Sequence, residues 1–264
     1  MEPITERGVE RVGRDGRVHL ADALVTEAPV EFRLGDTPIA VLMRTPGHDA
    51  ELGLGFLITE GIVLGPHEVD ALRPRTSGED GDRWDVVLAT DVAVDAERFR
   101  RNSYTTSSCG VCGKASIDAV RIAAPAPPPG PSVERATLLS LPGRMLDAQA
   151  GFAATGGIHA AALFEADGAL VAIREDVGRH NAVDKLIGHV AVRRWPIGEA
   201  VLLVSGRISF EIVQKAAVAG IPVVCGVSAA SSLAAELGEE LGLTVVGFLR
   251  GDGFNVYAGS HRVL

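Results

Sequence analysis

Cysteine is scarce in this sequence: only three of its 264 residues are cysteine. Folds that depend on disulfides need several pairs, so this count argues against a disulfide framework. Cys109 and Cys112 lie three positions apart, and Cys225 stands alone in an apolar run. This usage fits a reducing cytoplasm, and Cys225 is expected to be a buried structural thiol.

An excess of positive charge is also missing, since the formal net charge is −9. General electrostatic attraction to nucleic acid or to an anionic membrane is therefore not expected. The start of the sequence has no region of signal-peptide character, and apolar runs such as Val201–Val204 are far too short to span a membrane. We expect a cytoplasmic protein without a nucleic-acid or membrane partner, in which local arginines and backbone amides hold any anionic ligand.

The sequence does contain 47% hydrophobic residues and 31 glycines. This composition suits a compact α/β protein, and the length allows one large domain or two unequal ones. Residues 1–104 are predicted to be a strand-rich N-terminal part, in which Asp49 caps a helix over 50–59. Residues 105–130 are predicted to hold a cysteine loop, a helix and a proline-rich connector, and residues 131–264 an α/β domain.

The close cysteine pair lies in a loop bracketed by glycines, Ser108-Cys109-Gly110-Val111-Cys112-Gly113, which is followed by Lys114 and a helix-compatible run. The positive end of a helix and a neighbouring ammonium both favour a thiolate over a thiol. A thiolate is the form that attacks sulfur or binds a metal. The pair is therefore compatible with a redox dithiol, with half of a zinc site or with a persulfide carrier.

A zinc site would need a second close pair of Cys or His ligands, which Cys225 alone does not supply. A phosphate-binding P-loop is also excluded. Ser108 stands where that motif needs a glycine, and Ala115 replaces its hydroxyl residue.

Strands and helices alternate clearly from residue 200 onward, with apolar strands predicted at 200–205, 221–227 and 243–248. Strands joined by helices run parallel, so their carboxyl ends meet at one edge of a sheet. The segments after these ends are Ser205-Gly206-Arg207-Ile208-Ser209, Ser228-Ala229-Ala230-Ser231-Ser232 and Arg250-Gly251-Asp252-Gly253. Small residues, free amides and two arginines at such an edge predict a site for an anionic, phosphorylated ligand.

A second polar stretch, residues 174–181, carries five ionisable side chains in seven positions after a predicted strand. This density indicates a site more than a solvated face, with His180 among its members. Asn181 is predicted to cap the next helix, and His159, at the start of another strand, is placed to point at the cluster. His48, in a turn before a helix, is interpreted as an ordinary surface residue.

Together these motifs resemble those of the formate dehydrogenase accessory sulfurtransferases, the FdhD proteins. Five stretches carry the resemblance, in order, over most of the chain from residue 105 onward. They are residues 108–113, 156–161 (Gly-Gly-Ile-His-Ala-Ala), 174–185, 205–211 and 247–251.

The resemblance implies a cytoplasmic sulfur carrier. Such a protein accepts sulfur as a cysteine persulfide from a cysteine desulfurase. It passes this sulfur to the molybdenum or tungsten of a bis(guanine dinucleotide) pterin cofactor, which formate dehydrogenase requires. The molybdopterin guanine dinucleotide cofactor is then a bound client, and no permanently bound protein metal is expected.

The resemblance also implies a homodimer and a fold. The implied fold is a three-layer α/β sheet with flanking helices, similar to the cytidine deaminases, plus a smaller strand-rich N-terminal domain. Deaminase chemistry is not implied, because the zinc signature H-x-E with P-C-x-x-C is absent.

By position, the resemblance places the persulfide on Cys109 and makes Cys112 the second catalytic cysteine. The family's cofactor-contacting segment falls on residues 248–253. The expected cofactor-binding residues are Phe248, Leu249, Arg250, Gly251, Asp252, Gly253, Ser205, Gly206, Arg207 and His180. The last position of the segment is often basic in the family, whereas this chain has Gly253.

Two other functions stay open. A dithiol oxidoreductase of the thioredoxin type would have the cysteine pair directly after the first strand of a βαβ unit, whereas residues 99–104 are mostly polar or charged. A molybdenum-cofactor-binding chaperone would hand over the cofactor without sulfur chemistry.

Overall fold

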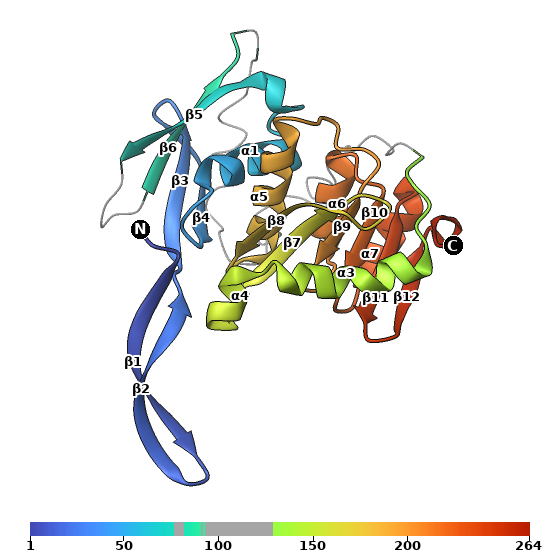
Figure 1. Ribbon diagram of the computed structural model, residues 1–264. Coiled ribbons are helices and arrows are strands. Elements are labelled where there is room, and N and C mark those ends of the chain that lie inside the picture. The colour runs from blue at the N-terminus through green and yellow to red at the C-terminus, as the bar shows by residue number, and fades with distance from the viewer. Residues whose placement is uncertain (77–81, 91, 93–128) are drawn as a thin grey trace.

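The computed structural model describes residues 1–76, 82–90, 92 and 129–264. Three sheets and their helices make up this part of the chain (Figure 1). The mixed α/β class predicted from the sequence is confirmed. The likeness to cytidine deaminases stays a prediction, as do the domain boundaries, since most of residues 105–130 lie outside the described ranges.

The N-terminal strands form two separate sheets. β1 (Ile4–Gly13) and β2 (Gly16–Val25) pair as an antiparallel hairpin that extends away from the rest of the molecule (Figure 1). The second sheet has the strand order β4-β3-β6-β5. Its strands are β3 (Ala28–Leu34), β4 (Thr37–Arg44), β5 (Val69–Thr76) and β6 (Asp82–Leu88), and a short 3-10 turn, η1 (Pro66–Glu68), precedes β5.

Helix α1 (Asp49–Thr59) packs against the four-stranded sheet through a shared apolar core that includes Val30, Phe32 and Leu57. The prediction that Asp49 caps this helix is wrong. The N-cap is His48 in a left-handed conformation with φ of 60°, and Asp49 is the first helical residue. The Asp49 carboxylate instead accepts hydrogen bonds from Arg44, at 2.7 and 2.9 Å.

The six-stranded sheet has the order β12-β11-β10-β9-β7-β8. Its strands are β7 (His159–Phe164), β8 (Leu170–Asp176), β9 (Val201–Val204), β10 (Val223–Gly226), β11 (Thr244–Arg250) and β12 (Gly253–Ala258). The parallel arrangement of β9, β10 and β11 is confirmed. β7 runs antiparallel to both of its neighbours, so β8 points the same way as β9.

Both faces of this sheet are covered, because its central strands carry apolar side chains on both sides. Leu202 and Val204 pack with helices α5 (Arg179–Ala191), α6 (Phe210–Val218) and α7 (Ser232–Leu241). Val201 and Leu203 pack with helix α3 (Arg135–Asp147) on the other face. A short helix, α4 (Ala150–Thr155), and a C-terminal 3-10 turn, η3 (Ser260–Arg262), complete the elements. Within the described ranges, no helix combines the length and apolar character needed to cross a membrane.

Helices α1 and α5 cross very closely. Their crossing joins the N-terminal unit, which contains the four-stranded sheet and α1, to the second unit, which is built around the six-stranded sheet. A Cβ atom added at Gly55 would lie 1.8 Å from the carbonyl oxygen of Asp184, and one added at Gly188 would lie 1.9 Å from the carbonyl oxygen of Glu51. Only glycine at both positions allows the two backbones to approach this closely.

Replacement of Gly188 by alanine is therefore expected to destabilise the protein by at least about 1–3 kcal/mol, because backbone atoms must move to make room. Gly143→Ala is the matched control. Gly143 also lies within a helix, but a Cβ there would meet nothing within 4 Å. The control is expected to be neutral or slightly stabilising. Urea unfolding of both variants measures the difference, and equal stability would show that α1 and α5 are not held this closely.

Candidate functional site

The candidate site lies at the edge of the six-stranded sheet where β8, β9, β10 and β11 end and β7 begins. Backbone hydrogen bonds hold the exit loops together. The Ile208 amide donates to Ala229 at 3.0 Å, and the Phe248 amide donates to Ser228 at 2.9 Å. The three strand exits predicted from the sequence are therefore adjacent in the structure.

Five residues meet at the exit of β9. The Ala160 amide donates to Ser205 Oγ at 2.9 Å, and the same oxygen lies 3.5 Å from His159 Nδ1. A Cβ at Gly206 would lie 3.5 Å from both His159 Nδ1 and Arg179 Cδ. Burial, followed by the charges of Arg179 and His180, lowers the pKa of His159 below its usual value, against the opposing charge of Asp176. The expectation that His159 points at the polar cluster is confirmed.

His180 belongs to a second polar group, at the start of α6. Its Nε2 lies 3.1 Å from Glu211 Oε2 and 3.3 Å from Ser209 Oγ, and Ser209 donates to Glu211 at 2.9 Å. Burial alone would raise the pKa of Glu211. The hydrogen bond and charge of His180, the Ser209 hydroxyl and the charge of Arg179 outweigh burial and lower this pKa below its usual value.

The segment predicted to contact the cofactor, residues 248–253, covers the end of β11, the turn that follows and the first residue of β12. Phe248 has a positive φ of 53°, and its ring lies 5.4 Å from the guanidinium carbon of Arg250. Residues 250–253 are exposed, whereas the Leu249 side chain is fully buried in the core. Leu249 as a whole has no exposed surface, so its predicted contact with a ligand has no support in the structure.

The stretch 174–181 has a largely structural role, which the sequence interpretation missed. Arg174 donates to Glu51 at 2.5 and 2.9 Å, and Glu175 accepts from the backbone at the start of α4. Asp176 pairs with the buried Lys185 at 2.7 Å. Of the five ionisable side chains in this stretch, only Arg179 and His180 adjoin the candidate site.

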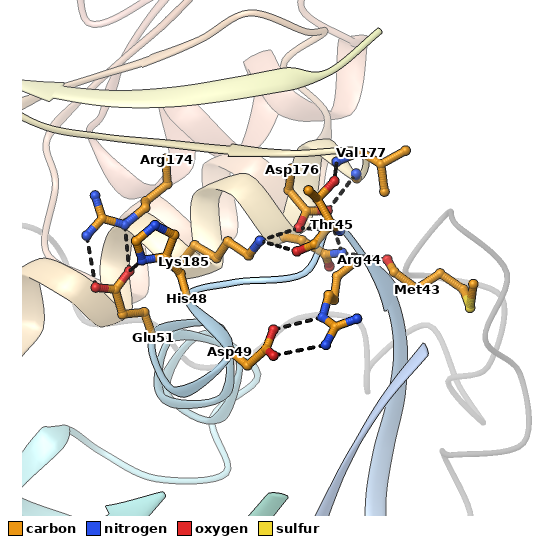
Figure 2. A network of polar contacts seen from close by, with 12 residues as sticks. Met43, Arg44, Thr45, His48, Asp49, Glu51, Arg174, Asp176, Val177 and Lys185 are labelled. Atoms are coloured by element: carbon orange, nitrogen blue, oxygen red, sulfur yellow. Dashed lines mark hydrogen bonds and ion pairs between the residues drawn. The ribbon is translucent and has the colours of Figure 1, made fainter. Parts of the chain in front are cut away.

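Asp176 is the centre of the network in Figure 2. Its fully buried carboxylate accepts hydrogen bonds from the backbone amides of Thr45 and Gly178, at 3.1 and 2.8 Å, and from Asn181 Nδ2 at 3.0 Å. Lys185 also donates to the Thr45 carbonyl at 2.7 Å. The end of β4 is thereby fixed to the turn between β8 and α5.

The prediction that Asn181 caps the following helix is wrong. Gly178 is the N-cap of α5, and Asn181 lies in the first turn. Its side chain donates to the Met43 carbonyl at 2.7 Å as well as to Asp176. It therefore joins the helix to β4.

Glu51 is the centre of a second contact between the two units (Figure 2). Burial would raise its pKa, but hydrogen bonds from Arg174, His48 and His189 lower it well below the usual range. The side chain of His48 is 56% exposed, so its interpretation as a surface residue is confirmed, although it also contacts Glu51 at 3.2 Å. Sequence analysis missed the roles of Glu51 and Thr45, because the residues to which they connect β4 and α1, Arg174 and Asp176, are more than 120 residues away.

The predicted catalytic pair, Cys109 and Cys112, lies outside the described residues. Cys225 is fully buried in the core against α3, and burial raises its pKa to about 12. Its interpretation as a structural thiol is confirmed. Among the described residues, no group of three or more His, Cys, Asp or Glu side chains is arranged to hold a metal ion.

Thr45 offers a test of the connection between β4 and the site. The Val177 amide donates to Thr45 Oγ1 at 3.0 Å. Thr45→Val keeps the shape of this buried residue but leaves the amide without its acceptor, at an expected cost of about 1–3 kcal/mol. Thr45→Ser retains the hydroxyl and should recover most of that loss. Urea unfolding of the two variants compares them, and a valine variant as stable as the serine variant would contradict the role of this hydrogen bond.

Comparison with known proteins gives consistent results. A family model described as the FdhD/NarQ family matches residues 25–264. The chain is 51% identical over 278 residues to the sulfur carrier protein FdhD of Streptomyces avermitilis, covering 100% of this chain and 97% of the relative. It is 48% identical over 272 residues to the protein of the same name from Mycolicibacterium paratuberculosis, covering all of both chains.

A solved structure shows the same fold. It is the crystal structure of a protein from Desulfotalea psychrophila that is described as a formate dehydrogenase accessory protein. The TM-score is 0.77 with 24% sequence identity, and the match covers 99% of each chain.

Proposed function

Because this chain belongs to the FdhD/NarQ family, we propose that it is a sulfur carrier. In this proposal Cys109 accepts sulfur as a persulfide from a cysteine desulfurase. The sulfur is then delivered to a molybdenum or tungsten ion held by a bis(guanine dinucleotide) pterin cofactor, which is the substrate, for use by formate dehydrogenase. The protein acts in the cytoplasm as a homodimer.

The observation that carries the ligand half of this proposal is the convergence of the strand exits at one edge. The structure records no ion pair between a described residue and Arg179, Arg207 or Arg250. Arginine side chains that lack a carboxylate partner among the described residues suit an anionic ligand with phosphate groups. Residues Ser205 to Arg207 and 248–253 are the proposed contacts.

The loading step conserves electrons and atoms. The Cys109 thiolate attacks the outer sulfur of the donor's persulfide, the S–S bond of the donor breaks, and the donor's cysteine leaves as a thiolate. A new persulfide now lies on Cys109. No oxidant is needed, because one S–S bond replaces another.

Cys112 offers a route for release. Its thiolate attacks the inner sulfur of the Cys109 persulfide, hydrosulfide leaves toward the metal, and a Cys109–Cys112 disulfide forms. A cellular thiol reductant then reduces this disulfide before the next cycle. This route gives each of the two cysteines a separate role.

The sulfur half is tested by removing one cysteine at a time. Wild-type protein is incubated with a desulfurase and cysteine, and its intact mass is measured. Wild type and Cys225→Ala, the matched control, are expected to gain sulfur, whereas Cys109→Ala gains none. In cells that lack their own carrier, Cys109→Ala should reduce formate dehydrogenase activity to background.

Each other result has a clear meaning. Full formate dehydrogenase activity with Cys109→Ala would overturn the role of this cysteine. A wild-type protein that supports the enzyme but never gains sulfur would instead indicate a molybdenum-cofactor chaperone. Rapid reduction of insulin disulfides by the wild type would favour a dithiol oxidoreductase.

A further inference from the structure

Two side chains at the exit of β9 have no part in the sulfur chemistry described above: His159 and Arg179. They border the space over Gly206, where a Cβ would lie 3.5 Å from a ring atom of His159 and 3.5 Å from Arg179 Cδ. Arg179 Nε is a buried donor without an acceptor among the described residues. Buried donors of this kind are usually satisfied, so this one indicates a missing partner.

The charges around this space favour an anion as that partner. The ionisable groups that act on His159 are Asp176 from β8 and Arg179 and His180 from α5. Glu211 from α6 contacts His180 and interacts with the charge of Arg179. Asp176 is paired with Lys185, and Glu211 with His180. Within the described residues, no carboxylate forms an ion pair with Arg179, although its charge also acts on Glu211, whose Oε1 is a buried atom without a hydrogen-bond partner there.

His159 is neutral in the free protein at neutral pH, because burial and the charges of Arg179 and His180 lower its pKa. Ser205 Oγ lies 3.5 Å from its Nδ1. A hydroxyl can donate to an unprotonated ring nitrogen or accept from a protonated one. The contact with Ser205 is therefore compatible with both charge states of the ring.

We propose that His159 is a ligand-binding residue, and that a phosphate group of the ligand lies over Gly206 between the imidazole and Arg179, with uptake of a proton by His159. This inference rests on the proposed function and extends it. The ligand class is a pyrophosphate diester, as in a dinucleotide. His159 then adds a positive charge only when the anion is present.

The direction of the pH dependence follows from linkage. A bound anion raises the pKa of His159 above its value in the free protein, so binding takes up a proton. Affinity is highest below the free-state pKa and is lost as pH rises through the bound-state pKa. For one proton, the affinity changes by at most about tenfold per pH unit.

Isothermal titration calorimetry with GDP-mannose tests this inference. The pyrophosphate of this probe is esterified at both ends, so it lacks the phosphate monoester that titrates near pH 6. Titrations in two buffers of different ionisation enthalpy measure the protons taken up. Wild type is expected to take up a substantial fraction of one proton at pH 7, and its Kd should weaken about three- to tenfold from pH 6 to pH 8.

Two variants make the test specific. His159→Gln keeps a polar side chain but cannot titrate, so its proton uptake and the pH dependence of its Kd should disappear. In Gly206→Ala the new methyl meets only ordinary contacts at 3.5 Å, so the fold should be retained. This methyl would overlap the proposed position of the phosphate group over residue 206, so binding should weaken at least about tenfold.

Several results would overturn the inference. One is binding of GDP-mannose to the wild type without proton uptake. Another is proton uptake that survives in His159→Gln but is lost in His180→Gln. A third is unchanged affinity in Gly206→Ala. Failure of GDP-mannose to bind would also overturn it. Sulfur loading of Cys109, measured by mass, is independent of all these results and tests the carrier function separately.

Discussion

The buried carboxylate of Asp176 is the group on which the arrangement of this molecule depends. A fully buried charge is unstable unless it is paired and hydrogen-bonded. Asp176 meets this requirement with donors from both units: the Thr45 amide from the N-terminal unit, and Gly178, Asn181 and Lys185 from its own. These bonds hold together only when β4, the end of β8 and the start of α5 are in place.

This constraint connects the N-terminal unit to the candidate site. Arg179 and His180 directly follow the turn that Asp176 fixes, and they lie beside Gly206 and Ser209. Two further contacts stabilise the interface between the two units. They are the close helix crossing at Gly55 and Gly188 and the ion pair between Glu51 and Arg174. The strand-rich N-terminal unit therefore helps to fix the positions of Arg179 and His180 at the strand-exit edge. Its own side chains are not among the predicted ligand contacts.

Sequence reasoning succeeded where local periodicity decides the structure. Alternation of apolar strands and helices after residue 200 predicted parallel strands, and their exits do meet. Sequence reasoning failed at the starts of two helices. Asp49 and Asn181 have the residue types of helix caps, but their side chains bond to other parts of the protein. The density of charge in residues 174–181 indicated a ligand site, but four of its five ionisable groups have partners within the protein, and Arg174, Glu175 and Asp176 hold elements of the fold together.

The sequence by itself determined the spacing of the cysteine pair, the order of strands and helices in the second half, and the family, because each depends on motifs of residues close together in the chain. Only the tertiary structure decided which charged side chains face the strand-exit edge. Arg174 pairs with Glu51, and Asp176 accepts a hydrogen bond from the Thr45 amide, across more than 120 residues of chain in each case. No local pattern records such a pairing. Burial then requires these charges to be satisfied inside the fold, which leaves Arg179 and His180 beside the edge.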